Sequence, residues 1–167
     1  MKIKKEDIDY IKSLTIGILL SIVLQVFFIK WYIINGSSME PTLQNYEIVL
    51  ADKYTKNYKN WDIIILDAPY QKEQKFFIKR IIGIPWDTIQ IKEWKVFRNW
   101  KELHETYIQG LTLWENTYHV PKWKYLVFWD NREHSTDSRK CFIGYCEKDL
   151  SPYLDESRIE GKVLFIK

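Results

Sequence analysis

Two residues of the chain, Ser38 and Lys79, have the side chains and the surroundings of a nucleophile and a general base. Ser38 lies in a segment of small and turn-forming residues, 36–43, which follows an uncharged apolar stretch. Lys79 lies inside the strongly apolar run 76–83. An ammonium group is costly to bury, so a lysine in such a run either extends its amine to solvent or is kept neutral. A neutral amine beside a serine hydroxyl would be a general base for a nucleophile.

The uncharged stretch, residues 13–29, predicts a single membrane anchor. Flanking lysine stems and the interfacial pair Trp31 and Tyr32 extend it to a span of about 20 residues. A cleaved secretory signal is disfavoured because residues 29–34 offer no small-residue cleavage site. The lysines that precede the stretch place the N-terminus in the cytoplasm by the positive-inside rule; they are Lys2, Lys4, Lys5 and Lys12. We therefore expect a cytoplasmic N-terminus at 1–12, a transmembrane anchor at 13–34 and an extracytoplasmic domain at 35–167 of a bacterial cell-membrane protein.

Length and composition fit one anchor and one modest folded domain. The chain has 167 residues, of which 46% are hydrophobic and 28% charged. The net charge of +3 is too small to indicate a nucleic-acid partner. Cys141 and Cys146 form a C-x4-C pair without a nearby histidine pair, which is not a zinc site. They are either free thiols or a short disulfide, and an extracytoplasmic location favours the disulfide.

The pattern after residue 41 predicts a mainly β fold: an all-β domain with irregular loops behind the anchor. Short apolar or alternating runs rich in Ile, Val, Phe and Tyr are separated by turn-forming residues. The expected strands are 47–51, 62–66, 76–82, 88–91, 95–98, 125–128 and 162–166. Residues 102–120 are less regular and are expected to be an extended loop or a small insertion.

Four segments resemble, in order and spacing, those of type I signal peptidases, the membrane-anchored Ser/Lys leader peptidases of the S26 family. The segments are 38–43, 62–65, 79–87 and 130–139. The resemblance implies a signal-peptidase-like catalytic domain that needs no cofactor or metal. It also implies that the enzyme cleaves N-terminal signal peptides from exported pre-proteins at the outer face of the membrane, with signal peptides and the lipid bilayer as its partners.

The resemblance assigns roles to five residues. Ser38 would be the nucleophile and Lys79 its general base, and Ser135 would hydrogen-bond and orient the lysine amine. Asp137 and Arg139 resemble the pair that braces that loop. The apolar residues beside Lys79, at 77, 78 and 81, would supply the desolvation that lowers the pKa of its amine.

Further expectations concern the oxyanion and the substrate. The Ser38 N–H would meet the oxyanion, and a second donor must come from elsewhere because Gly36 stands where some relatives have a serine. An extended peptide would bind by strand addition, with small residues at the first and third positions before the cut. Pocket walls are expected around Ile33, Ile34 and residues 76–78. The histidines at 104, 119 and 134 show no ligand or triad spacing.

One different function is compatible with the same segments. The chain could be a catalytically inactive membrane-tethered β domain that binds exported peptides. Intact Ser38, Lys79 and Ser135 argue against it, whereas Trp129 beside the Asp130 loop argues for it. The self-cleaving repressor-type Ser/Lys proteins are disfavoured because they lack an anchor.

Tryptophan is unusually placed in this sequence. Eight tryptophans accompany only six glycines. Six of them stand where glycine is expected. Trp61, Trp86 and Trp129 precede an aspartate in place of Gly-Asp, Trp94 and Trp100 stand in place of the glycine of Asp-Gly and Asn-Gly turns, and Trp123 lies between two lysines in another glycine-like position. Trp31 and Trp114 are less clearly glycine-like. The indoles are tolerated on the surface, or they anchor the domain at lipid headgroups, or they are glycines written as tryptophan because UGA codons were translated with the wrong genetic code. We favour the third interpretation because the positions are turn positions.

Overall fold

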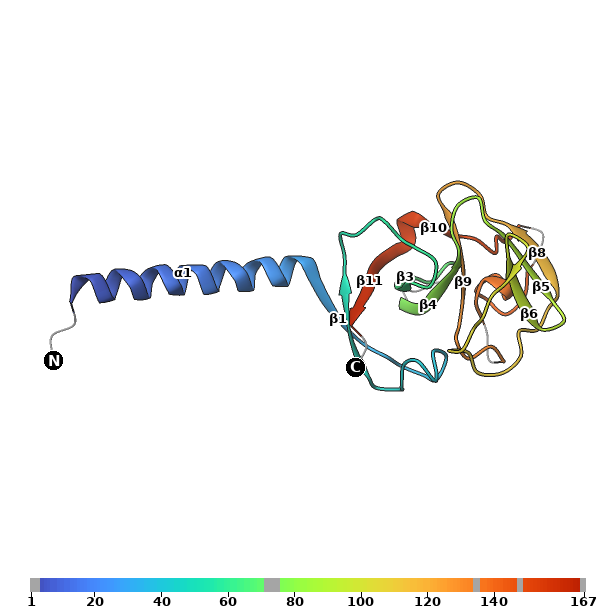
Figure 1. The fold of residues 1–167 in the computed structure, drawn as a ribbon, viewed down its shortest axis with the longest axis horizontal. Helices are drawn as coiled ribbons and strands as arrows, with labels where there is room; N and C mark the ends of the chain where they lie inside the picture. The colour runs from blue at the N-terminus through green and yellow to red at the C-terminus, as the bar shows by residue number, and fades with distance from the viewer. Residues whose placement is uncertain (1–3, 71–75, 134–135, 147–148, 166–167) are drawn as a thin grey trace.

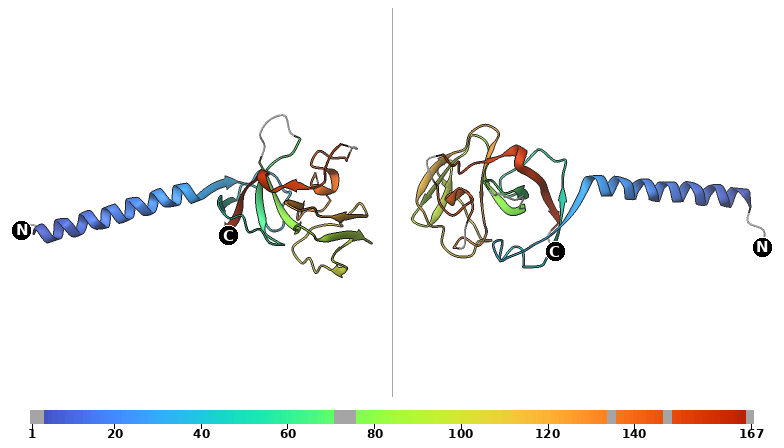
Figure 2. Two further views of the ribbon diagram at one scale, coloured as in Figure 1. Left: turned by 90° about the horizontal axis from the view of Figure 1, so that it is seen from above. Right: turned by 180° about the vertical axis from the view of Figure 1, so that it is seen from behind.

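The computed structural model describes residues 4–70, 76–133, 136–146 and 149–165. A long helix, α1 (Lys5–Phe28), is followed by a domain made of β-strands and loops. The helix extends away from the β domain without packing along it (Figures 1 and 2). Two residues of interest in the sequence, His134 and Ser135, lie outside the described part of the chain.

Helix α1 exposes large apolar side chains along its length, among them Ile16, Leu19 and Leu20. Within the described residues, no helix meets the length and hydropathy needed to cross a membrane. The helix ends at Phe28, before residue 34, where we expect the anchor to end. Ile29–Ile33 instead form strand β1, which pairs antiparallel with β2 (Ile48–Asp52). The physical reason is that this β-prone segment finds backbone partners on the sheet edge, which a continuing helix would leave unpaired.

Two antiparallel sheets build the β domain. The larger has the order β1-β2-β11-β3-β4-β9-β10 and the smaller β7-β6-β5-β8. The further strands of the larger sheet are β3 (Ile63–Asp67), β4 (Phe76–Gly83), β9 (Lys124–Phe128), β10 (Leu154–Asp155) and β11 (Ile159–Phe165). Those of the smaller are β5 (Thr88–Lys92), β6 (Lys95–Arg98), β7 (Lys101–Glu102) and β8 (Asn116–His119). Two short 3-10 helices, η1 (Ser138–Lys140) and η2 (Glu156–Arg158), complete the described elements.

The mainly β architecture predicted from the sequence is confirmed. All seven expected strands are present, within a few residues of their predicted bounds. Residues 102–120 are more regular than expected, because they include β8, which pairs with β5 as an edge strand of the smaller sheet. The cysteine prediction is also confirmed, since Cys141 and Cys146 form a disulfide directly after η1.

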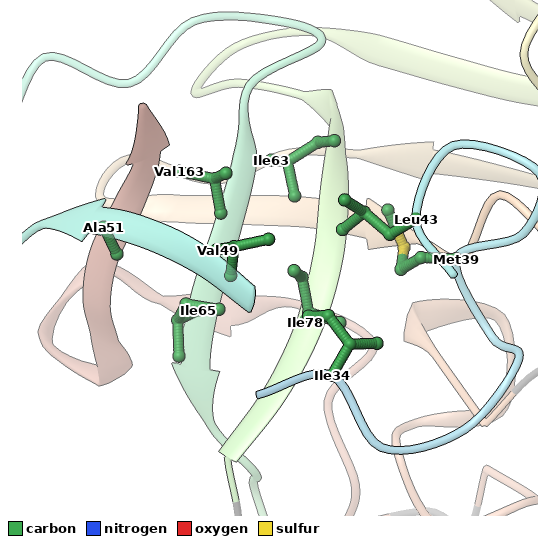
Figure 3. Close-up of a cluster of buried hydrophobic side chains, with 9 residues drawn as sticks. All are labelled: Ile34, Met39, Leu43, Val49, Ala51, Ile63, Ile65, Ile78 and Val163. Atoms are coloured by element: carbon green, nitrogen blue, oxygen red, sulfur yellow. The ribbon is translucent and has the colours of Figure 1, made fainter. Parts of the chain in front are cut away.

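One hydrophobic cluster fixes the loop that contains Ser38. The loop inserts two side chains, Met39 and Leu43, into the core between strands β2, β3 and β4 (Figure 3). Both side chains are completely buried. Their neighbours in the cluster are Ile34, Val49, Ala51, Ile63, Ile65, Ile78 and Val163. Burial of the residue directly after Ser38 holds the serine at the edge of this core.

Candidate active site

Ser38 and Lys79 line the same open pocket, which has a volume of about 370 Å³. Its walls come from the end of β1, the following loop, the first half of β4 and the residue after β9. The predicted wall residues are all present. The lining residues are Tyr32, Ile33, Ile34, Asn35, Gly36, Ser37, Ser38, Ile65, Phe76, Phe77, Ile78, Lys79, Trp129 and Thr136.

The Lys79 amine lies in an apolar, aromatic environment. Its side chain is fully buried on β4, and Nζ has no hydrogen-bond partner among the described residues. Nζ lies 4.3 Å from the ring centre of Phe77 and 4.0 Å from that of Trp129. Desolvation by this burial holds the pKa of the Lys79 amine well below its ordinary value of 10.5, and the negative charge of Asp137 opposes the shift only in part. Phe77 was expected to desolvate the amine, whereas the contact with Trp129 is visible only in the structure.

Ser38 is half-buried in the turn that follows β1. A single residue from the loop after β9 clamps this turn: Asn131 N–H donates to the Ser38 carbonyl at 3.0 Å, and Asn131 Nδ2 donates to the Ser37 carbonyl at 3.2 Å. The buried Met39 side chain holds the turn from the other side. The backbone of the serine is therefore fixed by contacts with two distant parts of the chain.

A buried ion pair ties the same loop to the strand that carries Lys79. Arg80, the next residue on β4, donates from Nε and Nη2 to both carboxylate oxygens of Asp130, at 2.8 and 2.6 Å. The Thr42 hydroxyl donates to Asp130 Oδ2 at 2.5 Å. Asp130 thus joins the serine loop, strand β4 and the end of β9 at one point.

The predicted brace, Asp137 and Arg139, forms a second buried ion pair with an Nη2–Oδ2 distance of 2.9 Å. Asp137 Oδ2 also accepts a hydrogen bond from the Trp129 N–H at 3.0 Å. Arg139 Nη2 donates to the Arg132 carbonyl at 3.0 Å. These bonds close the loop between β9 and η1 on itself, and Ser135 lies outside the described residues of that loop.

Sequence reasoning singled out the serine, the lysine and the brace, but it missed the residues that hold them together. Thr42, Arg80, Asp130 and Asn131 all lie within the four segments that carry the resemblance. That placement was a usable signal. It could not show that one carboxylate and one amide connect three of the segments.

In the described part of the chain, no group of three or more His, Cys, Asp or Glu side chains could hold a metal ion. His119 Nδ1 lies 3.1 Å from the Thr88 hydroxyl in the smaller sheet, and it does not line the pocket.

A serine and a buried amine that has no hydrogen-bond partner among the described residues line one open pocket of an antiparallel β domain; these are the groups that a serine peptidase with a lysine base requires. The chain belongs to the signal peptidase family, peptidase S26, whose family model matches residues 7–166. The chain is therefore a serine endopeptidase.

Similar proteins share most of their length with this chain. Signal peptidase I P of Bacillus subtilis subsp. natto is 35% identical over 161 residues, covering 88% of this chain and 86% of that protein. Signal peptidase I U of Bacillus subtilis strain 168 is 35% identical over 151 residues, covering 81% and 80%. The crystal structure of a signal peptidase I from Enterococcus faecalis V583 matches with a TM-score of 0.52 at 24% identity, over 65% of this chain and 97% of that one. This last likeness supports the fold alone.

Proposed function

We propose that this chain cleaves N-terminal signal peptides from exported pre-proteins, with Ser38 as the nucleophile and Lys79 as the general base. The observation that carries the proposal is the buried Lys79 amine, without a hydrogen bond to any described residue, in the pocket that Ser38 also lines. The relatives named signal peptidase I supply the substrate class. The relatives named signal peptidase I give no support to an inactive peptide-binding domain.

The lowered pKa of Lys79 suits it to accept a proton at neutral pH. Ser38 Oγ attacks the carbonyl carbon of the scissile bond while its proton passes to Lys79 Nζ. Collapse of the tetrahedral intermediate breaks the C–N bond, and the proton moves from Lys79 to the leaving amine. A water molecule then attacks the acyl ester and gives a proton to Lys79. Collapse of this second intermediate breaks the ester C–O bond, and Lys79 returns the proton to Ser38 Oγ.

The remaining residues act by positioning. The Ser38 N–H is the first donor to the oxyanion, and a second donor comes from a residue other than Gly36. Ser135 orients the lysine amine, and the ion pair of Asp137 and Arg139 keeps the loop of Ser135 in place. The clamp of Asn131 on the serine turn keeps the nucleophile's backbone fixed as the substrate binds.

The substrate binds as an extended chain beside the strands that line the pocket. Backbone pairing supplies affinity, and the apolar side chains of Ile33, Ile34 and Ile78 form shallow subsites. These subsites accept small residues at the first and third positions before the cut.

The N-terminal segment anchors the enzyme in the cell membrane with its N-terminus in the cytoplasm and its β domain outside. Residues 13–29 carry no charge, and lysines precede them. The disulfide between Cys141 and Cys146 suits an oxidising compartment outside the cytoplasm. Protease added to sealed cells should digest the β domain and spare a tag at the N-terminus; protection of the β domain would contradict this topology.

The catalytic proposal is tested by cleavage of a synthetic pre-protein with a small-residue cleavage site. Ser38→Ala and Lys79→Ala should each abolish cleavage, because one removes the attacking oxygen and the other the base. Ser37→Ala is the matched control, since this neighbouring serine is exposed and contributes only its carbonyl to the clamp. Cleavage retained by either Ser38→Ala or Lys79→Ala would refute the mechanism.

A further inference from the structure

Six of the eight tryptophans adopt the left-handed backbone that favours glycine. Their φ angles lie between 60° and 78°; the residues are Trp61, Trp86, Trp94, Trp100, Trp114 and Trp123. Among the described residues, twelve non-glycine positions have positive φ, so tryptophan supplies half of them. A bulky L-residue rarely enters this region because its Cβ approaches the neighbouring carbonyl oxygen.

Two of these positions close β-hairpins with two-residue loops. Glu93 and Trp94 connect β5 to β6, with φ of 51° and 63°. Asn99 and Trp100 connect β6 to β7, with φ of 50° and 66°. Positive φ at both central residues defines the type I′ turn, which strongly prefers Asn-Gly or Asp-Gly. Both tryptophans occupy the second central position, where glycine is usual.

Three more occupy the third position of a four-residue turn. The Asp62 N–H donates to the Lys59 carbonyl across Trp61, Asp87 N–H to the Ile84 carbonyl across Trp86, and Lys124 N–H to the Pro121 carbonyl across Trp123. Pro85, which precedes Trp86, stands at the second position. Proline at the second position and positive φ at the third are the signature of a type II turn, in which the third residue is normally glycine.

At four of these five turns the indole contributes little packing that would offset the backbone strain. Trp61 is the exception, since it is half-buried and its ring packs edge-on against Tyr107. Trp86 is 75% exposed and Trp100 is 81% exposed, and the indoles of Trp94 and Trp123 are also exposed. Trp31 behaves differently, since it lies in strand β1 and is not among the residues with positive φ. The unusual backbone therefore follows the turn positions and not tryptophan as a residue type.

Trp129 lacks the left-handed backbone but is misplaced for another reason. Its ring lies against the Lys79 amine, and its Nε1 is buried without a hydrogen-bond partner among the described residues. A buried N–H without a partner destabilises a protein, and tryptophan is normally buried only where its N–H is satisfied. The Trp129 side chain also lines the pocket that Ser38 and Lys79 share.

We propose that positions 61, 86, 94, 100, 114, 123 and 129 are glycine in the protein that the cell makes, encoded by UGA codons that its ribosomes read as glycine. The backbone carries the assignment at the first six positions. At 129 it is carried by the buried indole N–H, which has no partner among the described residues. Trp114, which the sequence pattern left aside, joins the set through its φ of 66°.

The assignment has a consequence for the active site, which rests on the proposed function. Glycine at 129 removes the aromatic ring that lies over Lys79 Nζ and keeps the backbone N–H that donates to Asp137. The pocket between Ser38 and Lys79 then widens on the side of the β9 loop. Phe77 remains as the aromatic neighbour that desolvates the amine.

The test is to sequence the codons and to analyse peptides of the protein purified from its own cells by tandem mass spectrometry. A recombinant protein with tryptophan at all eight positions is the reference for detection. We expect UGA codons and glycine-containing fragments at the seven positions. UGG codons, or tryptophan in fragments that span any of them, would overturn the proposal. Peptide mass does not depend on activity, so this result and a failure of the peptidase mechanism are separately recognisable.

Discussion

The strain at the turn tryptophans predicts that glycine stabilises the chain at Trp100, the most exposed of them. Trp100→Gly removes a Cβ from a residue held at a φ of 66°. The left-handed conformation costs an L-residue about 1–2 kcal/mol, and this cost disappears with the Cβ. Glycine loses more backbone entropy on folding than other residues do, and this reduces the gain in stability by roughly 0.5–1 kcal/mol.

Little packing is lost in the exchange. The indole is 81% exposed, so folding buries little of it beyond what an unfolded chain already buries. The net expectation is that Trp100→Gly raises the free energy of unfolding by about 1 kcal/mol. A glycine at the other exposed left-handed turns, those of Trp86, Trp94 and Trp123, should add a similar amount, because the turns lie in separate loops and independent sites are nearly additive.

The assay is equilibrium unfolding of the full chain in urea, in a mild detergent, followed by circular dichroism. With a slope of about 1–3 kcal/mol per molar urea, the midpoint should rise by roughly 0.3–1 M without a change of slope. Trp100→Ala is the matched control: it removes the indole but keeps the Cβ, and its stability should stay close to that of the parent. Trp31→Gly, at a 68% exposed position within strand β1, should lower stability instead. If Trp100→Gly is no more stable than Trp100→Ala, the strain argument is refuted.

Four further outcomes follow from the site. Folding lowers the pKa of Lys79, so between the folded pKa and 10.5 the unfolded chain binds more protons than the folded chain, and burying Lys79 costs most at low pH. Lys79→Met should therefore raise the free energy of unfolding measured in urea, by an amount that shrinks as the pH approaches 10.5. Cleavage rates should fall as pH drops through the folded pKa of Lys79, and a pH–rate profile without such a limb would exclude it as the base. Asp130→Ala removes the ion-pair partner of the buried Arg80 guanidinium and should lower the free energy of unfolding in urea by about 3–5 kcal/mol. A decrease below about 1 kcal/mol would contradict the structural role given to this ion pair. Met39→Ala should cost about 2–5 kcal/mol by the same measurement.

Local patterns accounted for most of the secondary structure. Strands such as β4 and β6 are visible in the sequence because alternation and β-branched residues act over a few positions. Strand β1 was read as the end of the anchor, because an apolar run of five residues fits either a helix or a strand and only the partner strand β2 decides between them. Strand β8 was missed because Asn116–His119 has little apolar character, and its pairing with β5 makes it a strand.

In the active site, too, some features could be predicted from the sequence and others only from the tertiary structure. The sequence alone was enough to propose Ser38 as the nucleophile and Lys79 as the base, because residue type and an apolar neighbourhood are local properties. It also pointed to glycine at turn positions, because Asn-Gly and Gly-Asp turns have a local signature. The common pocket of Ser38 and Lys79, the clamp of Asn131 on the serine turn, and the burial that lowers the pKa of the amine were decided only by the tertiary structure. Each of these depends on contacts between residues about 40 to 90 positions apart, which no pattern along the chain encodes.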